Sequence, residues 1–262
     1  MMATATVPDW RQRCNIFAEK ADDYDRWFDG NPIFMQELAA IRALLPYLQR
    51  PAVEIGIGPG RFAKALGVKF GIDQALPPLA HCRKRNILTA AGIGEALPIR
   101  TGVVGTCLLL LTLCFVKNPA TVLRECHRVL RPAGTLIIGM IPADSPWGRN
   151  IRQKQRDGNI WYRFSHLATI AATRQLLERQ GFRITDYRST LLQTPDKTVS
   201  RDHVQQKLDE QAGFCVIAAQ KEKTACLQHN RITENSSQTP CLFARVHPAN
   251  YQASLLQRST AL

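Results

Sequence analysis

The residues best suited to bind a ligand are three alternating glycines, Gly56, Gly58 and Gly60, in the stretch VEIGIGPGRF. They follow an apolar run that carries a carboxylate, Glu54, and they precede a stretch with helical character. A glycine-rich turn between a strand and a helix brings backbone N–H groups and a helix N-terminus to an anionic or polar ligand. Glycine is needed because a Cβ would block close approach of the backbone and the positive φ angles of the turn.

The spacing of the glycines distinguishes two kinds of loop. A dinucleotide-binding fingerprint, G-x-G-x-x-G, would require glycine at position 61, where this chain has Arg61. This position disfavours a nicotinamide-dependent oxidoreductase, as does the missing second half of such a domain. Taken alone, the glycines could also serve only as a turn or a helix cap.

Short apolar runs alternate with helix-forming segments around this loop. A helix is expected from Pro32 to Leu45, with Asn31 as its cap and an apolar stripe at Phe34, Leu38, Ile41 and Leu45. Strands are expected at 52–56, 68–73, 87–92, 103–113, 135–141, 182–187 and 213–220. Further helices are expected at 60–67, 75–85, 118–130 and 171–180. The alternation predicts an α/β fold with a doubly wound, mostly parallel seven-stranded sheet.

Three segments fall outside this alternation. Residues 1–30 are expected to form an N-terminal cap segment on a domain that spans 31–221. Residues from about 142 to 165 lack a clear period, and we interpret them as a lid or substrate insert because loops of that length are usually functional or disordered. Residues 222–262 are polar and poor in branched apolar side chains, which favours a disordered or loosely packed tail.

Composition and charge restrict the class of protein. The N-terminus lacks a secretion signal, and the longest apolar run is far short of the roughly 20 residues that a bilayer needs, so we expect a soluble, cytoplasmic protein. The net charge of +13 favours anionic partners such as nucleic acid, phosphate-bearing substrates or a membrane surface, without choosing among them. None of the eight cysteines forms a C-x-x-C pair, so we expect reduced thiols and no metal site.

Four segments together resemble the class I S-adenosylmethionine-dependent methyltransferases, in the small-molecule branch called type 11. VEIGIGPGRF is similar to the family's first motif, and Asp73 in FGID ends the second expected strand 19 residues after Glu54. GIGEALPI at 92–99 resembles a G-x-x-E-x-L-P-F loop, and VLRECHRVLRPAGTLIIG at 122–139 resembles the family's helix and fifth strand. The resemblance covers roughly residues 20–221 and implies a Rossmann-like methyltransferase fold with S-adenosyl-L-methionine as cofactor.

The resemblance also implies which residues bind the cofactor. Asp73 would hold the ribose hydroxyls, since a carboxylate can accept from both at once, and Gly94 to Ala96 would border the adenine. Tyr24 and Trp27 belong to DDYDRWF, which resembles an element that folds over the cofactor, although packing of a helix onto the sheet explains them equally well. The expected cofactor-binding residues are Tyr24, Glu54, Gly56, Ile57, Gly58, Gly60, Asp73, Gln74, Gly94, Glu95, Ala96 and Thr112.

Two positions depart from the family pattern. Gly105-Thr106 stands where the family usually has Phe-Asp, and Ala133 replaces the first glycine of a P-G-G turn. Both are expected to lie away from the cofactor, so they bear more on stability than on binding.

By resemblance, the acceptor lies over the carboxyl ends of the fourth and fifth strands, under the N-terminal helix and the insert. The candidate residues are Thr112 to Phe115, Asp144, Trp147, Tyr162 and His166. Methyl transfer is an in-line displacement in which the protein mainly orients donor and acceptor, so a general base is optional. A helix start or surface position explains His166, and a turn explains Asp144, so no catalytic residue is assigned.

Other acceptors stay open at this point. TLCF stands where several amino-methylating enzymes have N/D-P-P-Y, which argues against DNA adenine or glutamine as acceptor. Cys114 would suit an arsenite methyltransferase, but three converging thiols are not evident. The cations of the insert would form either a mouth for an anionic acceptor or nucleic acid, or a solvated face; they are Arg149, Arg152, Lys154, Arg156 and Arg163. We expect methyl transfer to a small molecule, with an RNA methyltransferase or a non-catalytic nucleic-acid-binding protein as the alternative.

Overall fold

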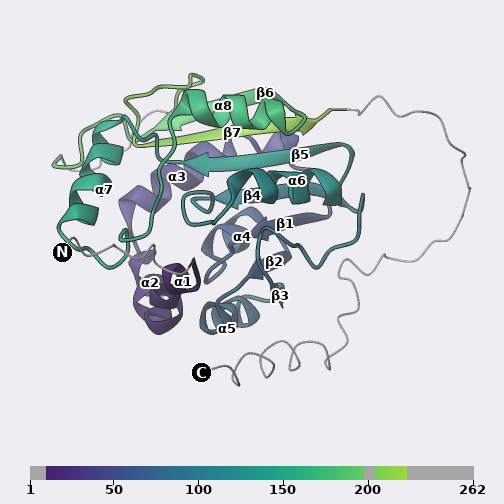
Figure 1. Cartoon of the computed structure of the whole chain (residues 1–262), viewed down its shortest axis with the longest axis horizontal. Coiled ribbons are helices and arrows are strands. Elements are labelled where there is room, and N and C mark those ends of the chain that lie inside the picture. The colour runs from purple at the N-terminus through teal and green to yellow at the C-terminus, as the bar shows by residue number, and fades with distance from the viewer. Residues whose placement is uncertain (1–9, 198–203, 223–262) are drawn as a thin grey trace, which may run out of the picture.

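Seven strands form one sheet in the computed structural model, which describes residues 10–197 and 204–222 (Figure 1). The strands are β1 (Ala52–Ile55), β2 (Phe70–Asp73), β3 (Leu88–Ala91), β4 (Val104–Leu110), β5 (Leu130–Met140), β6 (Phe182–Thr190) and β7 (Phe214–Lys221). Their order is β3-β2-β1-β4-β5-β7-β6, and neighbours are parallel except where β7 pairs with β5 and β6. The expected doubly wound, mostly parallel α/β fold is confirmed.

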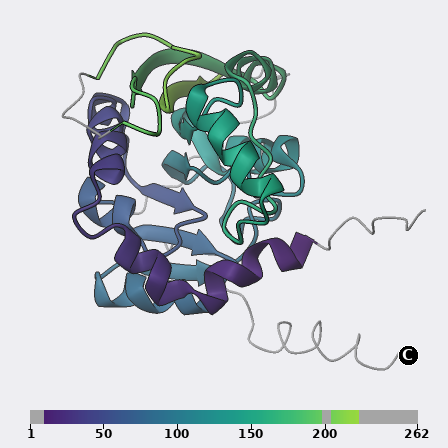
Figure 2. The same ribbon diagram turned by 90° about the vertical axis from the view of Figure 1, so that its left-hand side faces the viewer.

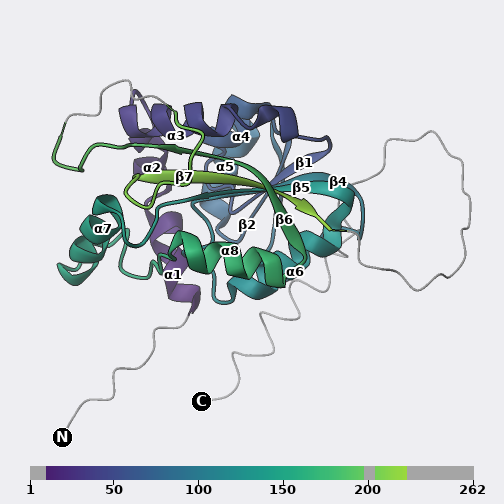
Figure 3. The same ribbon diagram turned by 90° about the horizontal axis from the view of Figure 1, so that it is seen from above.

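Helices cover both faces of the sheet (Figure 3). Within the described ranges they are α1 (Trp10–Glu19), α2 (Ala21–Trp27), α3 (Pro32–Arg42), α4 (Arg61–Leu66), α5 (Leu76–Lys84), α6 (Pro119–Val129), α7 (Pro146–Arg156) and α8 (Ile170–Arg179). Buried side chains of α3, α4 and α5 pack in one core cluster, and those of α6 and α8 pack in a second. The central strands β1 and β4 are buried along their whole length, which explains their nearly continuous apolar runs.

The helix after Asn31 begins as expected but ends earlier. The Asn31 side chain accepts a hydrogen bond from the N–H of Ile33 at 2.9 Å, and a proline occupies the first turn. The helix stops at Arg42 and is followed by a 3₁₀ turn, Leu45–Tyr47. Leu45 is therefore not part of the apolar stripe: it is 39% exposed, whereas Leu44 is fully buried.

The insert contains a helix that its sequence pattern did not predict. Ser145 caps α7, because its Oγ accepts from the N–H of Gly148 at 2.9 Å, and Pro146 occupies the first turn. The helix is polar nearly all round and buries only Gly148 and Ile151, so it lacks a clear apolar period. The next helix, α8, begins at Ile170 rather than at His166, which is exposed in the connection before it.

The two departures from the family pattern lie in tight backbone environments. A Cβ at Gly105 would lie 2.7 Å from the carbonyl oxygen of Gln49, so a larger residue is excluded there. Ala133 adopts a φ of +58°, a conformation that a glycine would accommodate without strain. Gln49 and Gln220 both donate side-chain hydrogen bonds to the Ala133 carbonyl. Neither position lines the cavity at the opposite end of the strands.

The parallel strands point toward the edge of the sheet where α1, α2 and α7 lie, on the left of Figure 1. Figure 2 faces this edge and shows α1 and α2 crossing it, with α7 beside them. No helix among residues 10–197 and 204–222 is long and apolar enough to span a bilayer. Apart from Glu222, the expected tail lies outside the described residues, as do residues 1–9 of the expected cap segment.

Candidate cofactor and acceptor site

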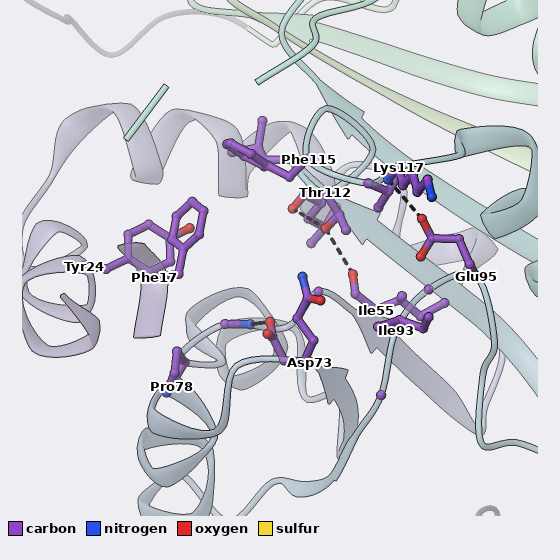
Figure 4. A pocket seen from close by; sticks show the side chains of 18 residues that line it. Phe17, Tyr24, Ile55, Asp73, Pro78, Ile93, Glu95, Thr112, Phe115 and Lys117 are labelled. Carbon is purple, nitrogen blue, oxygen red and sulfur yellow. Dashed lines mark hydrogen bonds between the residues drawn. The ribbon is translucent and has the colours of Figure 1, made fainter. Parts of the chain in front are cut away.

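A cavity opens at the carboxyl ends of β1, β2 and β4, where the strand order reverses between β1 and β4 (Figure 4). Open α/β sheets bind their ligands at such a switch point. The expected cofactor-binding residues that line this cavity are Tyr24, Gly56, Gly58, Asp73, Gln74, Gly94, Glu95 and Thr112. They come from four separate stretches of the chain besides α2, so the fold brings together what the sequence pattern placed at strand ends.

The alternating glycines are required by the backbone and by Thr112. Gly56, Gly58 and Gly60 have φ angles of +71°, +52° and +80°, which side chains rarely allow. A Cβ at Gly56 would lie 2.4 Å from Cγ2 of Thr112, whose hydroxyl donates to the carbonyl of Ile55 at 3.0 Å. The loop therefore approaches β4 so closely that only glycine fits.

Asp73 ends β2 with its carboxylate against the loop. Its Oδ2 accepts from the N–H of Gly58 at 2.8 Å, and its Oδ1 accepts from the N–H of Ala75 at 2.9 Å. Burial raises the pKa of Asp73, and these N–H groups partly oppose that shift. An ionised carboxylate has about four acceptor positions, and the backbone N–H of Gln74 is a third partner, so about one position stays available for a ribose hydroxyl. The residues present thus fit a ribose.

Four expected cofactor-binding residues do not line the cavity: Glu54, Ile57, Gly60 and Ala96. Ile57 packs over β2, where a Cβ at Gly71 would lie 2.1 Å from its Cδ1, and Gly60 is the N-cap residue just before α4. Glu54 is 2% exposed, and its Oε2 has no hydrogen-bond partner among the described residues. Burial raises the pKa of Glu54 to about 8. Ala96 instead belongs to the turn after β3, where its N–H donates to the Ile93 carbonyl at 3.2 Å.

The loop GIGEALPI, which was predicted to border the adenine, is hydrogen-bonded to the residues just before α6. Gly94 and Glu95 line the cavity together with Ile93. Oε1 of Glu95 accepts from the backbone N–H groups of Lys117 and Asn118, at 3.0 and 3.2 Å (Figure 4). The carboxylate therefore fixes the loop in place from the side.

Four aromatic side chains, which we call the aromatic wall, close the other end of the cavity: Phe17, Tyr24, Phe115 and Trp161. Tyr24 on α2 faces Phe17 on α1 in Figure 4, with ring centroids 5.1 Å apart. Phe17 also contacts Phe115 at 5.2 Å, and Tyr24 contacts Trp161 at 5.8 Å. A Cβ at Gly58 would lie 3.3 Å from Cε1 of Tyr24, so this ring covers the glycine loop.

An ion-pair latch holds α2 over the cavity. Arg61 makes a bidentate contact with Asp25, with Nε and Nη2 at 2.7 and 2.8 Å, and its Nη1 lies 2.7 Å from Asp29. Arg85 on α5 lies 2.9 Å from the Asp25 carboxylate. Burial of Asp25 opposes ionisation, but the hydrogen bonds from Arg61 and Arg85 outweigh it and lower its pKa. Arg61, which stands where a dinucleotide-binding loop would need glycine, thus positions Tyr24, the residue directly before Asp25.

The acceptor candidates from the sequence are only partly brought together. The Phe115 ring lies 5.2 Å from the Phe17 ring, and Tyr162 lies within electrostatic reach of Tyr24, whereas Asp144 is exposed and lies 3.5 Å from Arg152. Trp147 donates to the Gln193 carbonyl at 2.7 Å. Within the described residues, no group of three His, Cys, Asp or Glu side chains could hold a metal ion, so no thiol set converges on Cys114.

Sequence reasoning missed Phe17, Trp161 and most of the apolar lining. The missed lining residues are Phe17, Ile55, Pro78, Gly92, Ile93, Leu110, Leu111, Phe115, Val116 and Lys117, although Phe115 was an acceptor candidate. The missed lining residues that lie at the ends of β1, β3 and β4 could have been found from their positions next to strand ends. Phe17 and Trp161 lie in segments without a clear period, so nothing in the local pattern marked them.

Comparisons with known proteins show the family to which this chain is related. A family model described as methyltransferase domain matches residues 53–138. An uncharacterized protein of Mycobacterium tuberculosis (strain ATCC 25618 / H37Rv) is 38% identical over 224 residues, 82% of this chain and 77% of its own length. An uncharacterized protein of Methanocaldococcus jannaschii is 31% identical over 208 residues, 79% of this chain and 99% of its own length.

A solved structure points the same way. The structure of a SAM-dependent methyltransferase from Thermotoga maritima, described as a possible histamine N-methyltransferase, is 29% identical and superimposes with a TM-score of 0.75. The match covers 80% of this chain and 100% of that chain. The chain belongs to the class I S-adenosylmethionine-dependent methyltransferases, and its cofactor is S-adenosylmethionine.

Proposed function

We propose that the enzyme methylates a small-molecule acceptor that enters between Tyr24, Phe115 and the segment after α7. The observation that carries this proposal is the enclosure of the cavity end by rings from α1, α2, the β4–α6 connection and the α7–α8 connection. A chamber bounded by aromatic side chains suits a compact organic molecule better than an extended polymer. The description of the Thermotoga protein, whose suggested acceptor is a small amine, agrees with this reading.

In this proposal Asp73, Gly58 and Glu95 orient the cofactor, and the sulfonium it carries supplies an electrophilic methyl group. The chain's own contribution is to hold the acceptor in line and to exclude water. Tyr24 covers the loop at the junction of donor and acceptor spaces. Burial raises the pKa of Tyr24, so its hydroxyl stays protonated and can donate a hydrogen bond.

The nucleic-acid alternative rests on the net charge of +13. The cations of the insert, however, are engaged locally. Arg149 and Arg152 donate to the carbonyls of Asp144 and Ala143 at the start of α7, and the ammonium of Lys154 lies 6.0 Å from the Tyr162 ring. Cations held in this way are less available for phosphate contacts.

Binding of S-adenosylhomocysteine, measured by calorimetry, tests the cofactor half of the proposal. We expect Asp73→Ala to weaken binding by about 30-fold or more, because hydrogen bonds to a charged group contribute about 1.5–3 kcal/mol. A mobility shift with tRNA fragments at moderate salt tests the acceptor half. We expect no specific shift, and a specific shift at moderate salt that fades steeply as salt rises would favour the RNA alternative.

A further inference from the structure

One carboxylate near the cavity is not explained by the cofactor. Glu37 lies in the core-facing stripe of α3, between the buried residues Phe34 and Ile41. It is 2% exposed, and its Oε2 has no hydrogen-bond partner among the described residues. No ion pair of Glu37 is found in that part of the chain either. An unpaired buried carboxyl is destabilising, so a purely structural role would favour an apolar residue here.

Glu37 does not line the cavity, but it lies within electrostatic reach of Tyr24, which does, and of Tyr162. Burial raises the pKa of Tyr24, and the nearby Glu37 carboxyl raises it further, followed by Asp73 and Glu54. Burial also raises the pKa of Tyr162, and there Glu37 and Cys114 are the neighbouring groups that add to it. Glu37 thus lies within electrostatic reach of both phenols, and Tyr162 is reached by Glu37 rather than by the carboxylates of the cofactor loop.

The chemistry around Glu37 selects one class of ligand. Tyr24 and Trp161 present aromatic rings 5.8 Å apart, and Phe17 packs against both. Aromatic faces attract a cation, and a buried carboxylate neutralises one. An ionised Glu37 would repel a carboxylate or phosphate ligand, and a neutral Glu37 could donate only one hydrogen bond to it. An alcohol would satisfy one hydrogen bond without using the charge.

We infer that Glu37 anchors a small primary or secondary amine as the methyl acceptor and takes up the proton that this amine must lose. The inference rests on the proposed function of the site. The ammonium gives one proton to the Glu37 carboxylate, and its nitrogen lone pair forms the new bond to the methyl carbon. The methyl–sulfur bond breaks with its electron pair on sulfur, so the product leaves as a methylated ammonium. Glu37 then releases its proton to solvent.

The empty site tolerates Glu37 because the group is a neutral acid there. Burial raises its pKa to about 8, with no compensating cation. An ammonium that enters next to it stabilises the carboxylate and lowers this pKa. Amine binding near pH 7 should therefore release a proton from the protein, which an isosteric alcohol would not do.

The test uses the full-length chain saturated with S-adenosylhomocysteine. Calorimetry compares three primary amines, carrying butyl, phenethyl and imidazolylethyl groups, with the alcohols and carboxylates of the same shape. We expect at least one amine to bind about tenfold or more tightly than its alcohol and carboxylate, with proton release seen as a dependence of heat on the buffer's ionisation enthalpy. No amine preference, or amine binding without proton release, would overturn the inference.

Two variants separate the possible causes. Glu37→Gln should lower the amine preference by about tenfold while S-adenosylhomocysteine affinity stays near that of the wild type. Glu178→Gln, at an exposed carboxylate on α8, is the matched control and should change neither. An unchanged amine preference in Glu37→Gln contradicts the inference. If Glu37→Gln does not fold, the proton-release measurement on the wild type decides. Absence of S-adenosylhomocysteine binding to the wild type would instead count against the proposed cofactor site.

Discussion

The two ends of the cavity are built differently. The cofactor end consists of one loop after β1 and one carboxylate after β2, joined by backbone hydrogen bonds such as Gly58 N–H to Asp73. The acceptor end consists of side chains from α1, α2, α3 and the segments after β4 and α7, which contact one another through rings and charge and through one backbone hydrogen bond, from the His166 N–H to the Cys114 carbonyl at 2.7 Å. The cofactor end is thus preformed by local geometry, whereas the acceptor end exists only when distant segments pack.

The latch between Asp25 and Arg61 connects these two ends. Arg61 begins α4 directly after the glycine loop, and Asp25 follows Tyr24 on α2. Their bidentate contact therefore couples the loop to the aromatic wall. Changes on either side of the latch should show which end depends on the other.

The largest effect is expected at the preformed end. Gly56→Ala adds a Cβ that would lie 2.4 Å from Thr112 Cγ2, at a φ of +71°. We expect S-adenosylhomocysteine affinity to fall by about 30-fold or more, because the strain alone is worth about 1–2 kcal/mol. Adding Thr112→Ala should recover part of this loss. Gly102→Ala, with a φ of +72° and open space around it, is the control. Its cofactor affinity should not change, and an equal loss there would show that loop geometry is not the cause.

The next effect concerns the latch. Arg61→Met leaves Asp25, whose side chain is 12% exposed, without its bidentate partner. We expect the free energy of unfolding in urea to fall by about 2 kcal/mol, less than for a fully buried pair because Arg61 is partly solvated. S-adenosylhomocysteine affinity should fall with it, since Tyr24 loses its support.

The matched control lies on the same helix. Arg26 pairs with Asp23, and both side chains are well exposed, at 68% and 49%. Arg26→Met should lower the free energy of unfolding by at most about 0.5 kcal/mol. Equal losses in Arg26→Met and Arg61→Met would mean that the latch has no special role.

A third effect is the pH dependence of stability. Burial raises the pKa of Glu37 and of Glu54 from near 4.5 to about 8, so the folded protein holds protons that the unfolded chain releases. This contribution is complete below about pH 4.5 and is lost as pH rises through 8, at up to about 1.4 kcal/mol per pH unit for each group. Tyr24 and Tyr162 stay neutral over this range because the pKa of each is raised.

Urea unfolding of the cofactor-free protein between pH 5 and 8 checks this slope. Glu37→Gln should reduce the slope of the free energy of unfolding against pH by the contribution of one carboxyl group. Glu178→Gln should leave this slope as in the wild type. A decline that is equally steep in Glu37→Gln would show that Glu37 is already ionised in the folded state.

The smallest effect is expected on α7. Lys154→Gln combined with Arg156→Gln removes two exposed charges of the insert. The KM for a small amine should change by less than about twofold, because exposed charges are screened by solvent. A large rise in KM would move the acceptor toward this surface and would revive the anionic or nucleic-acid reading.

The cofactor end was predictable because each of its residues is marked by local pattern. Glycines at 56, 58 and 60 and a carboxylate at the end of β2 follow from the turn geometry and from strand ends. The mostly parallel pairing also followed from the alternation of elements, whereas the strand order was not predicted. Ile57 and Glu54 were also expected to bind the cofactor, but they do not line the cavity, because a sequence motif does not separate lining residues from supporting ones.

The acceptor end was not predictable in the same way. Helix α7 carries no apolar stripe, so its cap at Ser145 was the only local signal. Glu37 interrupts an otherwise apolar stripe on α3, which is a visible signal, but its proximity to Tyr162 depends on packing across more than a hundred residues. Contacts between side chains of distant segments leave no periodic trace.

The most direct test of the account is a crystal structure of the full-length chain with S-adenosylhomocysteine bound. The account predicts that the ribose hydroxyls bind Asp73, the adenine lies beside Gly94 and Glu95, and the sulfur faces Tyr24 and Tyr162. A ribose bound away from Asp73, or a sulfur turned away from the aromatic wall, would contradict it.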